Sequence, residues 1–92
     1  ENNKFNEYMK YAERGNSAAL FNVGVMHSRG IGVTQDKLKA AEYYQKAADK
    51  GNAKAQLNLS LMYQKGNGVT INKEKAFELC KLAAEQGNVN LT

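Results

Sequence analysis

Small and apolar residues recur along this chain at helical spacing, in two alternating patterns. The first pattern places its apolar positions at i, i+1, i+4 and i+8, which share one face of an α-helix. The second is an alanine-rich stripe, which lets neighbouring helices approach closely. We therefore predict alternating helices of two kinds, A over 17–29 and B over about 36–50 and 72–86. For helix A the stripe residues are Ala19, Leu20, Val23 and His27 at the first occurrence and Ala55, Leu59 and Tyr63 at the second. For helix B they are Ala40, Tyr43, Tyr44, Ala47 and Ala48 at the first occurrence and Ala76, Leu79, Cys80, Ala83 and Ala84 at the second.

The two patterns belong to one repeat. Gly-Asn pairs begin at Gly15, Gly51 and Gly87, and the steps from 15 to 51 and from 51 to 87 are both 36 residues. Residues 17–52 align without a gap on 53–88, with 15 of 36 columns identical. A fixed period of this size is typical of a solenoid. We expect one solenoid domain over 1–92, with helix B of a partial repeat at 1–16, two repeats, and the start of a further helix at 89–92.

Glycine and amide residues mark the predicted helix ends. Gly51 suits the position after a helix, where left-handed backbone is common, and Asn52 can then cap the next helix. A connection this short favours antiparallel neighbours. Between helices A and B, two glycines spaced by one residue allow positive φ at both, and Asp36 and Asn72 suit the N-cap of helix B. The expected structural glycines are Gly30, Gly32, Gly51, Gly66, Gly68 and Gly87.

These residues resemble the Sel1-like repeat. The pattern A-x-x-N-[VL]-[GS]-x-M-[HY]-x-x-G-x-G-V, followed by K-A-x-E and A-A-x-x-G, covers nearly the whole chain. The resemblance implies an all-α fold, a right-handed superhelical solenoid of antiparallel helix pairs related to tetratricopeptide repeats. Ser60 departs from the family's usual glycine, which Gly24 keeps, and His27 stands where Tyr63 has the usual residue type. The family shares a scaffold and not a partner.

Catalytic and metal chemistry find little support in the sequence. His27 is the only histidine and Cys80 the only cysteine, so a metal site lacks ligands. His27 occupies the Tyr63 column, a packing position, and we expect Cys80 to be a buried, inert thiol on the helix B stripe. The G-x-G segments follow helices and not strands, unlike nucleotide-binding loops. We expect no enzyme activity, no catalytic residue, no cofactor and no metal.

The net charge of +4 and the pI of about 9.2 change this interpretation little. The lysines are spread along helix B among acidic residues, whereas a nucleic-acid surface would show clustered charge and more arginine. No stretch is long and apolar enough to insert into a membrane. We expect a protein or peptide partner, no nucleic acid and no membrane insertion, with self-association through the solenoid ends left open. We favour a bacterial protein, periplasmic or secreted over cytoplasmic.

The partner surface is expected on helix A, which lines the concave side of such arrays. Several of its residues outside the core stripe are apolar where a solvated face would be polar, with a basic rim at Arg29 and Lys65. The alternative is that adjacent helices cover these positions, which would then belong to the core. The paired Asn22 and Asn58 would hold a peptide backbone or bond between helices. The expected partner-binding residues are Phe21, Val25, Ser28, Arg29, Lys54, Leu57, Leu61, Gln64 and Lys65.

Three functions follow from the repeat and the resemblance. The first is a protein–protein interaction module that binds its partner on the concave helix A face, as an adaptor, a scaffold or an inhibitor of the immunity type. The second is a structural spacer within a larger repeat protein. The third is binding or hydrolysis of a cell-wall compound, as in cysteine-rich relatives, whose paired cysteines are missing here.

Overall fold

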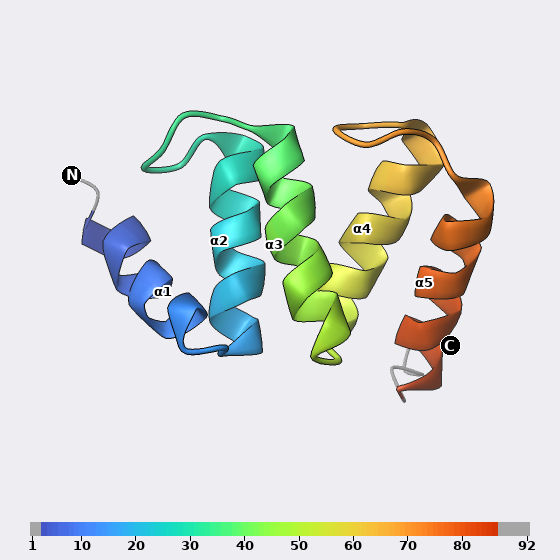
Figure 1. Ribbon diagram of the computed structural model, residues 1–92, viewed down its shortest axis with the longest axis horizontal. Helices are drawn as coiled ribbons and strands as arrows, with labels where there is room; N and C mark the ends of the chain where they lie inside the picture. Colours follow the sequence, from blue (N-terminus) through green and yellow to red (C-terminus); the bar gives the residue numbers. More distant parts are fainter. Residues whose placement is uncertain (1–2, 87–92) are drawn as a thin grey trace.

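The computed structural model describes residues 3–86, and within that range the chain forms five helices and no strand. Each helix packs against its neighbours in the chain, so the helices stand side by side in sequence order (Figure 1). The molecule measures 38 × 26 × 21 Å. The helices are α1 (Asn3–Glu13), α2 (Ser17–Arg29), α3 (Lys37–Asp49), α4 (Ala53–Lys65) and α5 (Lys73–Glu85). Helix A of the sequence is therefore α2 and α4, and helix B is α1, α3 and α5. Gly87 and residues 89–92, expected to begin a further helix, lie outside the described residues.

The short turns between repeats combine a C-terminal and an N-terminal cap. Gly51 has φ +92°; its N–H donates to the Ala48 carbonyl at 2.9 Å, and the Asn52 N–H donates to the Ala47 carbonyl at 3.0 Å. This is a Schellman arrangement, which satisfies carbonyls at the end of a helix. The Asn52 side chain then accepts from the Ala55 N–H at 2.9 Å, which begins α4. The turn at Gly15 and Asn16 has the same bonds.

The longer loops between helices A and B lie at one edge of the molecule (Figure 1). Gly30 and Gly66 end α2 and α4 in left-handed geometry, with φ +72° and +70°. Each loop also bonds back to its helix, because the Asp36 N–H donates to the His27 carbonyl at 2.8 Å and the Asn72 N–H to the Tyr63 carbonyl at 2.9 Å. The loops therefore hold each A–B pair in one orientation.

The core follows the predicted stripes except at two residues of α5. Val23 and Leu59 are fully buried, and Ala40, Ala47 and Ala55 let the helices approach closely. Cys80, expected to be buried, is exposed, and so is Ala84. The equivalent Tyr44 is buried because α4 lies beyond α3, whereas the described residues place no helix beyond α5.

Candidate functional site

Five of the expected partner-binding residues lie together in one hollow of about 260 Å³. Phe21, Val25, Ser28 and Arg29 come from α2, and Leu61 comes from α4 of the next repeat. We call this the α2–α4 hollow. Its other lining residues are Lys37, Tyr44, Asn58, Met62 and Asn67. Leu61 is 51% exposed, so a large apolar side chain faces solvent at the mouth of the hollow.

Tyr44 is a lining residue that the sequence placed only in the core. Its ring is buried and lies 5.7 Å from the Phe21 ring, centroid to centroid. Burial raises the pKa of Tyr44 above its ordinary value, against the lowering effect of the Asn58 and Ser28 side chains near its hydroxyl. The hydroxyl therefore stays protonated near neutral pH, as a neutral polar group among apolar side chains.

The side chain of Asn58, on α4, lies near the Tyr44 hydroxyl of α3, a contact between helices. It also lines the α2–α4 hollow. The polar part of this hollow is thus already ordered by the chain's own contacts, and a ligand would meet it preorganised.

A second hollow, of about 520 Å³, brings three of the predicted residues of α4 together with α5. Leu57, Leu61 and Gln64 line it beside Phe77 and Cys80. We call it the end hollow. Phe77 is 68% exposed, and the sequence did not mark it. Lys54 and Lys65 are exposed on α4 and line neither hollow, so the predicted basic rim is represented in the α2–α4 hollow by Arg29.

The α5 residues of the end hollow have covered counterparts one repeat earlier. The positions equivalent to Phe77 and Cys80 are Ala41 and Tyr44, and both are buried, with Tyr44 near Asn58 of α4. The face of α5 that these residues form is thus the face on which α3 receives α4. Leu61 connects the two hollows, because it lines both.

His27 has the packing role that its repeat column indicates. It is buried, stacked on the Tyr43 ring at 5.6 Å and 13°, and met edge-on by Phe5 at 5.5 Å. Its Nδ1 is buried without a hydrogen-bond partner among the described residues. Burial and then the charge of Lys39 lower the pKa of His27, while Asp36 and Glu42 oppose them. The imidazole is therefore neutral near pH 7.

Residues 3–86 contain no group of three or more His, Cys, Asp or Glu side chains arranged to hold a metal ion. Within the same residues, every helix is too short or too polar to cross a bilayer.

The chain belongs to the Sel1 repeat family, whose pattern matches residues 17–52 and 53–88. Three solved structures are similar to it. A Sel1 repeat protein from Oxalobacter formigenes shares 30% identity over 97% of this chain, with a TM-score of 0.93. A protective antigen of uropathogenic Escherichia coli, c5321, with an SLR fold, shares 42% over 88%, with a TM-score of 0.85. Helicobacter pylori cysteine rich protein B shares 27% over 94%, with a TM-score of 0.89.

The chain spans only part of these relatives: 37% of the Oxalobacter protein, 17% of c5321 and 65% of the Helicobacter protein. A comparison with curated proteins finds no match. Sel1 repeats are commonly protein–protein interaction modules, and the fold is generally a non-catalytic scaffold. The all-α solenoid is thereby established, and the bacterial neighbours support the expected bacterial origin.

Proposed function

We propose that this chain binds a protein partner on the α2 and α4 face, through the α2–α4 hollow and the adjoining end hollow. The observation that carries the proposal is the convergence of Phe21, Val25 and Leu61, from two repeats, around one hollow. Apolar side chains around a few fixed polar groups are the usual composition of a recognition site. In this role the module serves as an adaptor, a scaffold or an inhibitor.

Exposed apolar surface separates this proposal from a spacer. Single exposed leucines are ordinary, whereas several exposed apolar side chains around one hollow mark an interaction site, and a repeat that only separates other domains needs none. Leu61 is 51% exposed and Phe77 68% exposed, and they line the same end hollow. The partner segment we expect is therefore amphipathic, with its apolar side on Leu61 and a polar atom near Tyr44.

The test is capture of a partner from a lysate of the source organism by wild type, Leu61→Glu and Leu82→Glu chains. Leu82 is the matched control, because it is 48% exposed on α5 and lines neither hollow. Both positions are exposed, so each variant should keep its stability within about 0.5 kcal/mol of wild type. We expect a protein retained by wild type and Leu82→Glu and lost by Leu61→Glu. Equal capture by all three chains would refute the proposed face.

A further inference from the structure

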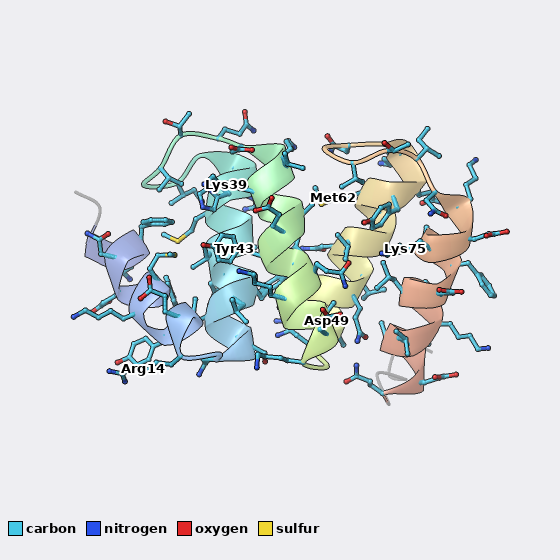
Figure 2. The ribbon with its side chains drawn as sticks, viewed as in Figure 1. Arg14, Lys39, Tyr43, Asp49, Met62 and Lys75 are labelled. Atoms are coloured by element: carbon cyan, nitrogen blue, oxygen red, sulfur yellow. The ribbon has the colours of Figure 1, made fainter. Side chains whose placement is uncertain are left out.

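The seam between α1 and α2 is closed by aromatic rings. Phe5 of α1 meets His27 of α2 edge-on, with 5.5 Å between ring centroids and 87° between planes. His27 also stacks on Tyr43 of α3, which Figure 2 shows between α2 and α3. Edge-on contacts at this spacing are favourable for aromatic pairs. A ring at position 5 thus fills the outer side of position 27.

The next seam, between α3 and α4, has one ring at the equivalent place and lacks the ring that covers it. Thirty-six residues on, Tyr63 replaces His27, Leu79 replaces Tyr43 and Ala41 replaces Phe5. A hollow of about 400 Å³ lies there. Lys75 of α5 places its Nζ 5.1 Å from the Tyr63 ring centroid, and it lies between α4 and α5 (Figure 2). We call this hollow the Tyr63 slot; Leu38, Ala41, Gln45, Lys46, Tyr63 and Val69 line it.

Alanine at position 41 is specific to this seam. The same repeat position holds Phe5 in α1 and Phe77 in α5, so an aromatic residue suits this column of helix B. Ala41 is buried at the bottom of the slot. The methyl group of Ala41 is smaller than the benzyl group of a phenylalanine, so the slot has room for one further ring beside Tyr63.

The rim of the slot is apolar at this seam and polar at the equivalent positions of the other repeats. Leu38 and Ile71 are 58% and 54% exposed. The residue equivalent to Leu38 is Asn2 one repeat earlier and Glu74 one repeat later, and the equivalent of Ile71 is Gln35. Both apolar residues line an adjoining hollow of about 660 Å³, which shares Leu38, Tyr63 and Val69 with the slot. Three departures from the repeat therefore fall at one place.

The charges beside the slot favour an acidic partner segment. Lys46 lines the slot and Lys75 lies over its tyrosine, against the single lining carboxylate of Glu42. The adjoining hollow runs along loop 66–72, so a polypeptide could lie across it while one side chain enters the slot. The loop is fixed there, because a Cβ added to Gly68 would come within 2.8 Å of the Lys37 Cβ.

We infer that the Tyr63 slot binds an aromatic side chain of an acidic partner segment, with its ring meeting Tyr63 edge-on as the Phe5 ring meets His27. The partner backbone then runs past Leu38 and Ile71. The slot shares no lining residue with the α2–α4 hollow, so this interaction stands apart from the proposed function and can succeed or fail without it.

The test is a titration of the full chain with acetyl-Asp-Phe-Asp-amide, followed by methyl NMR of Leu38, Val69 and Ile71. The matched probes are acetyl-Asp-Leu-Asp-amide and acetyl-Asp-Ala-Asp-amide. We expect saturable shifts of these methyls, with the phenylalanine probe binding about tenfold more tightly than the alanine probe. Absence of saturable shifts, or equal binding of the three probes, would overturn the inference.

Two variants locate the binding. Ala41→Phe fills the slot with a ring of the chain itself and should weaken binding of the phenylalanine probe about tenfold or more. Leu61→Glu, in the α2–α4 hollow, should leave binding of this probe unchanged. Circular dichroism checks that the Ala41→Phe chain folds. If it does not, the exposed pair Leu38→Asn and Ile71→Gln, which restores residue types from the other repeats, should weaken binding instead. If either folded variant, Ala41→Phe or the Leu38→Asn and Ile71→Gln pair, binds the phenylalanine probe with wild-type affinity, the site is refuted.

Discussion

A Cβ added to Gly24 would lie 2.7 Å from Cδ1 of Tyr44. This close approach lets the tyrosine ring pack flat against α2 and carry its hydroxyl to Ser28 and Asn58. In the second repeat both residues differ: Ser60 replaces the glycine and Cys80 replaces the tyrosine. Ser60 uses the space, because its Oγ donates to the Ala76 carbonyl at 2.7 Å. The departure from the family's glycine is therefore compensated on the neighbouring helix.

Gly24→Ser should destabilise the chain when Tyr44 is present. Overpacking of this kind costs roughly 1–3 kcal/mol, which urea unfolding would measure. Tyr44→Cys alone should also destabilise, because it removes a buried ring. The double variant reproduces the pair found in the second repeat, so its loss should be smaller than the sum of the two single losses. Additive losses would show that the two positions do not interact.

Gly66→Val should destabilise the chain by about 1–3 kcal/mol, because a β-branched residue resists φ +70°. Its Cβ would also come within 2.6 Å of Ile71 Cγ1. Gly51→Val is the matched control, since Gly51 has φ +92° and no atom within 4 Å of the added Cβ. Thermal melting should show a larger loss at position 66 than at 51, and an unchanged melting temperature at 66 would contradict the role of this loop.

The stability of the chain should fall as the pH drops below the ordinary His27 pKa of 6.5. Burial lowers the pKa of His27 in the folded state, so the unfolded chain binds the proton first. The contribution of neutral His27 is present above pH 6.5 and lost as the pH falls through the folded pKa. His27→Tyr introduces the residue type that the second repeat has at this position, and it should remove the pH-dependent contribution of His27 to the stability. Denaturant unfolding at a series of pH values measures the difference, and identical slopes for both chains would contradict it.

Cys80 should react in the folded chain. It is exposed, and an accessible thiol reacts with a disulfide reagent by thiol–disulfide exchange. Native and urea-unfolded protein should therefore react with a disulfide reagent at rates within about tenfold of each other. Strong protection in the native protein would mean that α5 is covered in solution, for example by a second copy of the chain.

The helices and their ends could be predicted closely from the sequence. The Gly-Asn turns and the N-caps Asp36 and Asn72 are determined by residues within a few positions of one another, so local chemistry is sufficient. The exposure of Cys80 could not be predicted in this way. It depends on what packs beyond α5, and its repeat equivalent Tyr44 gave the opposite expectation.

The candidate site was predictable in part. The face of α2 and α4 followed from the apolar positions beyond the core stripe, and the structure brings Phe21, Val25 and Leu61 to one hollow. The role of Tyr44 was missed because helical periodicity gives the direction of a side chain and not how far its hydroxyl reaches. Lys54 and Lys65 were expected in the same surface and lie outside the two hollows.

The proposed function places a protein partner on the α2 and α4 face, in contact with Leu61. Photo-crosslinking in a lysate of the source organism, with p-benzoylphenylalanine at position 61 or at the control position 82, tests that contact directly. We expect a defined covalent adduct from position 61 and none from position 82, with the adduct competed by unlabelled wild-type chain. An adduct from position 82 alone, or none from either position, would contradict the claim.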